Sequence, residues 1–362
     1  MYRGWGRFDL LPGDARGRRI SELRLSCARA FRALAESDLL DLASSGTTGQ
    51  HGFTRDGNES VRGPREVRSH LVIHQPVRSG NPLAKMQPLF YGSAAPVMDE
   101  YADLVAAAVT LMEVLDTVTL ESMELIESKL GLCFGELGGD LVLGERLLRF
   151  QWYPRLDSGD AVDLVYSEGS QRIAVRAVEV GDLGTIVRAA PHVDIGHWTW
   201  QVYASDDGLM FWDDHNRNSI EAPPGPWMYG NCCEFMNLKV RSLSAPVHWV
   251  DCTDKAMRFD RLSISYFVHA RPSVKLRGLT AGQLLYDRLL RLGYPVHREI
   301  LSVKQLLGVP ALTEPRLLEA LLAYEQRGGI PSGYAVGASR YYRVGLGRVE
   351  RVQSGRTVHD SE

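Results

Sequence analysis

Residues 191–196 read PHVDIG. Its histidine and aspartate stand two positions apart, and alternate residues of a β-strand point to the same face of the sheet. His192 and Asp194 can therefore reach one metal ion. A second histidine, His248, follows in APVHWV, residues 245–250. Two histidines and one carboxylate leave one side of a metal open, an arrangement typical of non-haem Fe(II) sites that use O₂.

An arginine and a serine follow on the strand-like run RLSISYFV, residues 261–268. Arg261 and Ser263 share one face of such a strand. A guanidinium fork beside a hydroxyl binds a carboxylate through charge-assisted hydrogen bonds. An arginine buried among apolar neighbours needs an anionic partner, and a bound carboxylate would provide it.

The motifs His-x-Asp, His and Arg-x-Ser, in this order, resemble the 2-oxoglutarate-dependent Fe(II) oxygenases of the isopenicillin N synthase-like family. His-x-Asp alone occurs often by chance, whereas the ordered set is far more specific. Further matches are LRFQWYP at residues 148–154, GFTRDGNE at 52–59, DGL at 207–209 and LTAGQLL at 279–285. The resemblance extends roughly from Gly4 to Gly293.

The resemblance implies a role for each site residue. His192, Asp194 and His248 would bind Fe(II), and 2-oxoglutarate and O₂ would be cosubstrates. An aspartate rather than glycine or alanine at position 194 argues against a halogenase. The predicted 2-oxoglutarate contacts are Arg261, Ser263, Tyr153 and Gln151, with Gln151 in place of the family's asparagine. The predicted substrate contacts are Phe53, Arg55, Arg62, Trp198 and Trp200.

Three other histidines compete as ligands, and we expect none of them to bind the metal. His197 has the opposite strand alternation from His192 and should face away. His215 lies in a polar turn, and His269 lies near the end of the strand that carries Arg261.

Apolar periodicity predicts helices at residues 20–43 and 101–132 and again between 281 and 327. Short runs rich in β-branched and aromatic residues predict strands at 146–153, 194–203, 210–212, 247–250 and 263–268. The expected class is mixed α/β, an all-β core plus helices. The resemblance makes that core a double-stranded β-helix, a cupin-like jelly roll flanked by helices.

We expect three regions along the chain. Residues 1–140 would be an N-terminal helical and loop region, 141–275 the jelly-roll core, and 276–362 C-terminal helices with a polar tail. The run WGRF at residues 5–8 resembles the second strand of the family's N-terminal unit, so that unit looks shortened. Residues 160–187 look like an insertion that pairs as a hairpin over the site's mouth.

Composition restricts the function classes. The 362 residues are 44% hydrophobic and carry a net charge of −3, which argues against a nucleic-acid partner. No apolar run is long enough for a membrane span. Five cysteines without metal-binding spacing predict reduced thiols in a cytoplasm. Arginine-rich stretches at 3–32 and 55–78 reflect genomic bias or an anionic substrate.

Three functions remain open. The first is an oxygenase that hydroxylates, desaturates or cyclises a small polar metabolite, in bacterial secondary metabolism such as antibiotic biosynthesis. The second is an isopenicillin N synthase-type oxidase without 2-oxoglutarate, in which Arg261 and Ser263 hold the substrate's own carboxylate. The third is an inactive family member that acts as a binding protein. We expect a monomer or a homodimer, and the sequence does not name the substrate.

Overall fold

The computed structural model describes residues 4–37, 52–54, 64–75, 102–142, 144–156, 159–168, 171–271, 274–282, 284–285 and 288. Its helices are α1 (Ala15–Ala35), α3 (Ala102–Leu130), α4 (Glu136–Leu141) and α5 (Glu234–Lys239), with 3-10 turns at η3 (Gly181–Leu183) and η4 (Asp254–Met257). None of these helices is long and apolar enough to cross a membrane, as far as the described chain extends.

The larger sheet has seven antiparallel strands. In spatial order they are β1 (Trp5–Asp9), β13 (Trp227–Cys232), β10 (Trp198–Ala204), β15 (Arg261–Val268), β5 (Arg146–Tyr153), β4 (Ser69–His74) and β2 (Gly52–Thr54). The predicted strand over 146–153 is confirmed, and the WGRF run forms β1 as expected.

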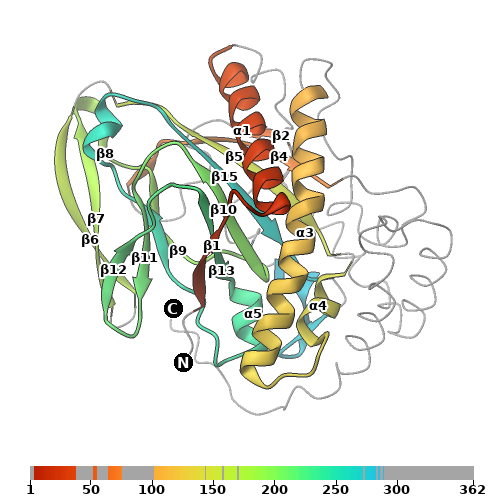
Figure 1. Ribbon diagram of the computed structural model, residues 1–362. Helices are drawn as coiled ribbons and strands as arrows, with labels where there is room; N and C mark the ends of the chain where they lie inside the picture. The colour runs from red at the N-terminus through yellow and green to blue at the C-terminus, as the bar shows by residue number, and fades with distance from the viewer. Residues whose placement is uncertain are drawn as a thin grey trace, which may run out of the picture.

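The smaller antiparallel sheet faces the first (Figure 1). Its strands are β12 (Asn218–Glu221), β11 (Leu209–Asp213), β14 (His248–Val250) and β9 (Ala189–His192). Apolar side chains from both sheets meet between them, including Tyr153, Leu209, Phe211 and Val250. Two facing sheets of this kind make a jelly roll, so the predicted fold class is confirmed.

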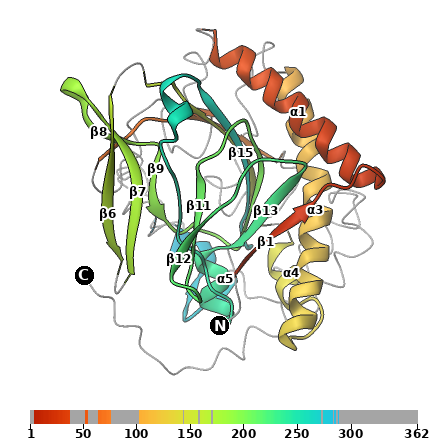
Figure 2. The same ribbon diagram turned by 60° about the vertical axis from the view of Figure 1, so that its left-hand side comes forward.

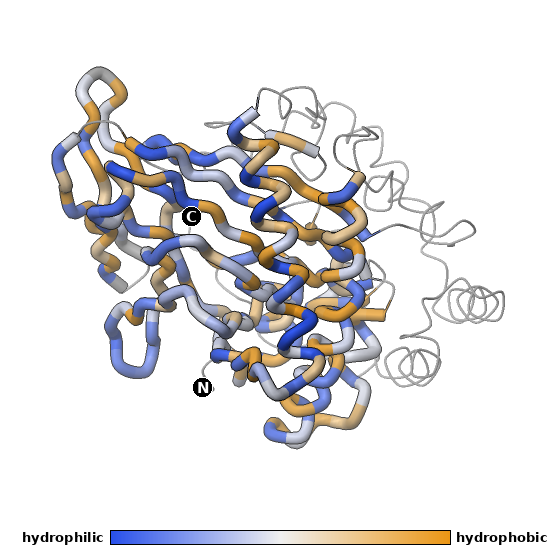
Figure 3. The backbone as a smooth tube through the Cα atoms, turned by 45° about the horizontal axis from the view of Figure 1, so that its top comes forward, coloured by the Kyte–Doolittle hydropathy of each residue, from blue (hydrophilic) through white to orange (hydrophobic). Residues whose placement is uncertain are grey.

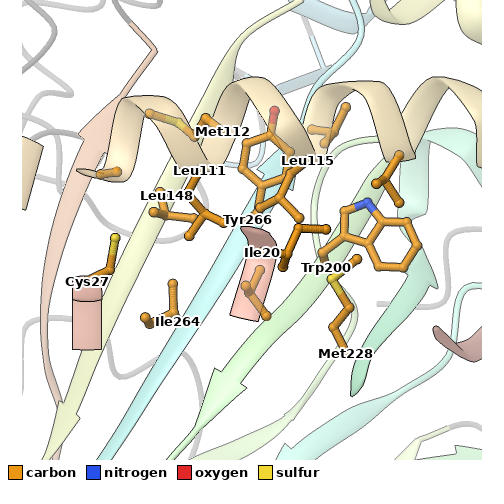
Figure 4. Close-up of a cluster of buried hydrophobic side chains, with 14 of the residues drawn as sticks. Ile20, Cys27, Leu111, Met112, Leu115, Leu148, Trp200, Met228, Ile264 and Tyr266 are labelled. Atoms are coloured by element: carbon orange, nitrogen blue, oxygen red, sulfur yellow. The ribbon is translucent and has the colours of Figure 1, made fainter. Parts of the chain in front are cut away.

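Helices α1 and α3 lie side by side on the outer face of the larger sheet (Figures 1 and 2). Strand alternation sends Leu148, Ile264 and Tyr266 toward these helices, where they meet Ile20 and Leu111 (Figure 4). In Figure 3 hydrophobic and hydrophilic residues are intermixed along the tube, as expected for helices and strands that bury only one face. The other face of the same strands is therefore left for the polar residues of the site.

The first helix begins earlier and ends earlier than predicted. Asp14 caps it, since its carboxylate accepts hydrogen bonds from the backbone N–H groups of Arg16 and Gly17. The periodicity alone did not reveal this cap because the first turn, residues 15–19, is mostly arginine and glycine. The second predicted helix matches α3 closely and, as expected, backs the barrel.

A third sheet forms from β3 (Arg65–Glu66), β8 (Gly184–Val187), β7 (Gln171–Val180) and β6 (Asp160–Glu168). The expected hairpin over 160–187 is present as β6 and β7. Its position differs from the prediction, because Ile173, Val175 and Ala177 pack against Trp212 and Trp249 on the smaller sheet. The hairpin buries an apolar stripe there, and none of its residues lines the site pocket.

Two short strands, β16 (Lys275–Leu276) and β17 (Leu279–Thr280), are the last strands of the described part of the chain. Most of the predicted region 276–362 lies outside the described residues. Within the described part of 1–140, β1, β2 and β4 belong to the same sheet as the barrel strands.

Candidate metal centre and carboxylate pocket

The three predicted metal ligands lie close together at one end of the smaller sheet. His192 ends β9 and His248 begins β14, and the two are directly paired across the strands. The Oδ1 atom of Asp194 lies 3.7 Å from Nε2 of His192 and 3.5 Å from Nε2 of His248. Their possible ligand atoms all lie within 4.8 Å of one another. One metal ion can therefore contact all three.

Backbone carbonyls orient both imidazoles. Nδ1 of His192 lies 2.7 Å from the carbonyl oxygen of Ala190, and Nδ1 of His248 lies 3.3 Å from that of Pro246. A carbonyl oxygen only accepts, so each Nδ1 carries a proton, and each Nε2 faces Asp194, where it would bind a metal once it is deprotonated. The side-chain amide of Asn231 donates to Oδ2 of Asp194 at 3.2 Å, which leaves Oδ1 for a metal.

Asp194 reaches the site from a loop, whereas we predicted a strand over 194–203. The strand β10 begins only at Trp198. Backbone hydrogen bonds tie the loop to α5, from the N–H of Glu234 to the carbonyl of Asp194 and from Phe235 to Gly196. Gly196 has φ 117°, a conformation that favours glycine. The structure does place Asp194 beside the two histidines, but loop anchoring rather than strand alternation brings it there.

Asp194, His192 and His248 shift one another's pKa values. Burial alone would raise the pKa of Asp194, but the charge and hydrogen bond of His248 lower the pKa overall. For His248 burial acts to lower the pKa, and the neighbouring Asp194 carboxylate raises it above the ordinary value. The site thus holds a negative charge that attracts a cation, as a divalent metal requires.

A pocket of about 160 Å³ opens beside these residues between the two sheets. Alternate residues of β5 and β15 form one wall, and their register pairs Tyr153 with Arg261 and Gln151 with Ser263. All four predicted 2-oxoglutarate contacts therefore line one pocket with the metal candidates.

Arg261 is buried at one end of this wall, with only 2% of its surface exposed. Its Nε donates to the carbonyl oxygens of Asp206 and Asp207 at 3.3 and 3.1 Å. The carboxylates of both aspartates bind Lys255. Within the described chain, Nη1 of Arg261 is buried and has no hydrogen-bond partner. A carboxylate in the pocket would supply the missing anion.

The neighbouring polar residues form a small network. The hydroxyl of Tyr153 donates to Oε1 of Gln151, and the hydroxyl of Ser263 donates to the same oxygen at 3.3 Å. The arginine also lies 5.1 Å from the centre of the Tyr153 ring. Gln151, in the position of the family's asparagine, therefore links the two hydroxyl groups that flank Arg261.

Several pocket residues were not predicted. Arg68 binds Glu66 at 2.9 Å, and Glu66 accepts a hydrogen bond from the N–H of Ala190 on the metal strand at 3.0 Å. Arg149 lies 5.3 Å from the ring of Phe267. The alternation of β5 from Tyr153 and Gln151 already points to Arg149, whereas no local pattern points to Arg68. His269, expected to be structural, also lines this pocket.

The predicted substrate contacts need correction. Phe53, Trp198 and Trp200 lie in the core between the larger sheet and the helices, and Trp200 donates to Oγ1 of Thr119 on α3 at 2.9 Å. The loop between Asp194 and Trp198 resets the strand alternation, so that Gln201 rather than either tryptophan faces the pocket. Arg55 and Arg62 lie outside the described residues.

The remaining histidines follow the expectation of a non-ligand role. His197 is fully buried beside Phe235, with ring centroids 6.5 Å apart. The backbone N–H of His215 donates to the carboxylate of Asp213 within the β11–β12 turn. Neither residue lines the pocket.

Comparisons with known proteins bear on the fold. No family model matches the chain, and no curated protein matches it. Solved structures do. A putative 2OG-Fe(II) oxygenase family protein from Caulobacter crescentus is 18% identical, with a TM-score of 0.60 over 80% of this chain and 90% of its own. A full-length Neurospora crassa protein in complex with alpha-KG and thymine is 17% identical, with a TM-score of 0.57 over 79% of this chain and 87% of its own.

A third similar structure is JOX2 in complex with 2OG, Fe and JA, at 15% identity and a TM-score of 0.55 over 80% of this chain and 78% of that one. At these identities the likeness establishes a shared fold. The chain has the jelly-roll architecture of these oxygenases, and its chemistry has to be argued from its own pocket.

Proposed function

We propose that this chain is an Fe(II)- and 2-oxoglutarate-dependent oxygenase that oxidises a C–H bond of a small polar metabolite. One observation carries the proposal. His192, Asp194 and His248 share a pocket with Arg261, a buried guanidinium that has an unsatisfied nitrogen among the described residues. The shared fold with structures that hold 2-oxoglutarate supports it.

The donor set fits Fe(II). Two imidazole nitrogens and one carboxylate oxygen leave positions for a bidentate cosubstrate and for O₂. Structural zinc prefers four protein ligands and often thiolates, yet no cysteine lines the pocket in the described part of the chain. All five cysteines are free thiols, which is compatible with the cytoplasmic location that we propose.

Iron with 2-oxoglutarate supplies the oxidising chemistry, and 2-oxoglutarate leaves as succinate and CO₂. The protein's part is to bind, orient and exclude water. Arg261 and Ser263 would hold the carboxylate that is remote from the metal, while Tyr153 and Gln151 keep the serine hydroxyl in place. Ala189, Leu209 and Val250 give the pocket its apolar lining, which strengthens these charged contacts.

The substrate would occupy the part of the pocket lined by Arg68, Arg149, Phe267 and His269. Arginines near the site would attract an anionic group on the substrate, and Phe267 offers an apolar face. Arg55 and Arg62 stay candidates for the same role. Hydroxylation, desaturation and cyclisation are all compatible with this lining. A role in bacterial secondary metabolism, such as antibiotic biosynthesis, rests on the resemblance of the sequence motifs alone.

The second candidate is an isopenicillin N synthase-type oxidase. The same unsatisfied Nη1 of Arg261 would then hold the carboxylate of the substrate itself. Formation of succinate separates the two enzymes, because only the first consumes 2-oxoglutarate. A binding protein without activity would differ from both by failing to hold stoichiometric iron.

An anaerobic Fe(II) titration tests the metal site. We expect the full chain to bind one equivalent, and His192→Ala or His248→Ala to lose binding while the protein stays folded. His215→Ala, in an exposed turn, is the matched control and should bind as the parent does. Parental iron affinity in either ligand variant would overturn the assignment.

A further inference from the structure

A second buried arginine lies near the end of the pocket that Arg261 lines. Arg188 stands between β8 and β9 and is 2% exposed. The centre of its guanidinium group lies 5.8 Å from the ring of Tyr153, and that of Arg261 lies 5.1 Å from the same ring. Two cationic groups therefore flank one aromatic side chain that lines the pocket.

Arg188 has few partners. Its Nη2 donates to the carbonyl oxygen of Phe259 at 3.3 Å, while Nε and Nη1 are buried without a hydrogen-bond partner in the described chain. No carboxylate of the described residues forms an ion pair with it. The carboxylate of Asp206 also raises the pKa of Arg188, less than burial and Arg261 lower it, and that carboxylate is bound by Lys255.

A buried guanidinium without an anion is costly unless a ligand provides one. Burial, and then the charge of Arg261, lower the pKa of Arg188 to about 10, so both arginines are cationic at neutral pH. Their mutual repulsion is present in the free pocket and is relieved when negative charge arrives beside Tyr153. The pair therefore favours a ligand with more negative charge.

We infer that Arg188 is a positioning residue of the cosubstrate pocket, which selects 2-oxo acids that carry a second carboxylate over monocarboxylates of the same length. The inference rests on the proposed function. Arg188 does not line the pocket, so it acts at a distance, through its charge and through Tyr153. Tyr153 in turn hydrogen-bonds Gln151, which accepts from Ser263.

The test compares two ligands and two variants of the Mn(II)-loaded full chain. 2-Oxopentanoate has the carbon chain of 2-oxoglutarate but lacks the second carboxylate. Arg188→Gln removes the charge and keeps an amide donor for the Phe259 carbonyl, whereas Arg188→Lys keeps the charge. Calorimetry gives the Kd of each ligand for each protein.

We expect Arg188→Gln to raise the Kd of 2-oxoglutarate about tenfold, the effect of a unit charge roughly 10 Å away at an effective dielectric of about 20. The Kd of 2-oxopentanoate should stay unchanged, and Arg188→Lys should keep most of the preference. Equal weakening of both ligands would show a merely structural role and overturn the inference, as would no change in either.

If Arg188→Gln does not fold, Arg188→Lys still decides, because loss of the preference in a variant that keeps the charge contradicts the inference. Failure of the proposed function looks different. In that case the unaltered protein itself does not prefer 2-oxoglutarate over 2-oxopentanoate.

Discussion

Arg261 shows how one buried charge defines a subsite. Its Nε donates to backbone carbonyl oxygens, and its Nη1 has no hydrogen-bond partner among the described residues. Arg261 lines the same pocket as His192, Asp194 and His248. We predict that Arg261→Ala raises the 2-oxoglutarate KM at least about tenfold, since a charge-assisted contact exceeds the roughly 1.4 kcal/mol that a tenfold change represents.

Steady-state kinetics with varied 2-oxoglutarate measures this effect. Arg258→Ala removes an exposed arginine nearby and serves as the control. An unchanged KM in Arg261→Ala would mean that another basic residue holds the carboxylate.

His197 gives the fold a defined pH dependence. Neither ring nitrogen has a hydrogen-bond partner in the described structure, and burial lowers the pKa of His197 well below its ordinary value of 6.5. Below pH 6.5 His197 is protonated in the unfolded chain but stays neutral in the folded chain, because its folded-state pKa is much lower. Its contribution to stability is therefore complete above about pH 6.5 and declines as the pH falls below it.

We predict that His197→Phe flattens this decline, by up to about 1.4 kcal/mol of unfolding free energy per pH unit. Urea unfolding at about pH 7, 6 and 5.5 spans the ordinary histidine pKa and gives the comparison. His215→Phe, at an exposed turn, should leave the parental pH dependence in place. Parallel pH profiles for the parent and His197→Phe would contradict the assignment.

At the residue scale the sequence predicted the residues that carry local motifs and missed those that depend on distant packing. His192, Asp194, His248 and Arg261 stand in short patterns with distinctive chemistry. Arg188 has its proposed role only because folding brings its guanidinium close to the ring of Tyr153. No spacing of residues in the sequence indicates this contact. Trp198 and Trp200 were assigned to the wrong face of their strand, because strand alternation cannot be counted through a loop whose path the sequence does not give.

Among the helices, α3 is held against the larger sheet by the buried carboxylate of Asp116. Oδ1 of Asp116 accepts from Nε of Arg146 on β5 at 2.7 Å and from the hydroxyl of Tyr266 on β15 at 2.5 Å. Asp116 is fully buried. These two strands also carry Gln151 and Ser263 on their opposite face, so the helix supports the pocket wall.

We predict that Asp116→Ala lowers the unfolding free energy by about 3 kcal/mol, because it removes a fully buried carboxylate that accepts hydrogen bonds from both Arg146 and Tyr266. Glu121→Ala on the same helix removes only the exposed pair with Arg16 and should cost less than about 1 kcal/mol. Chemical denaturation compares the two variants, and similar losses in both would contradict the role of Asp116.

Strong periodicity explains which elements were predicted well. Helix α3 buries one regular stripe, and strand β5 is a short run of large apolar and aromatic residues buried on both faces, so the sequence of each indicates its type and its extent. The β6–β7 hairpin was recognised, but its docking site was not, because nothing local encodes the partner surface of Ile173 and Val175.

At the scale of the whole molecule, the described N-terminal elements and the barrel share one sheet and one core. Strands β1, β2 and β4 pair within the larger sheet, and α1 and α3 cover its outer face. The predicted division at residue 140 stays a prediction. We expect a fragment of residues 141–362 to lack a cooperative thermal transition, because its sheet would expose the apolar face that the helices bury.

Thermal unfolding followed by circular dichroism, against the full chain, checks this expectation. A fragment that melts cooperatively would show that residues 141–362 fold without the N-terminal elements.

We propose that one pocket holds both Fe(II) and 2-oxoglutarate and that 2-oxoglutarate is oxidised there. The most direct measurement is succinate released from 2-oxoglutarate by the Fe(II)-loaded chain in the presence of O₂, with His248→Ala as the background. We expect one succinate for each 2-oxoglutarate consumed, over repeated turnovers that stop when a chelator removes the iron. Succinate no higher than that background, from unaltered protein that holds both iron and 2-oxoglutarate, would contradict it.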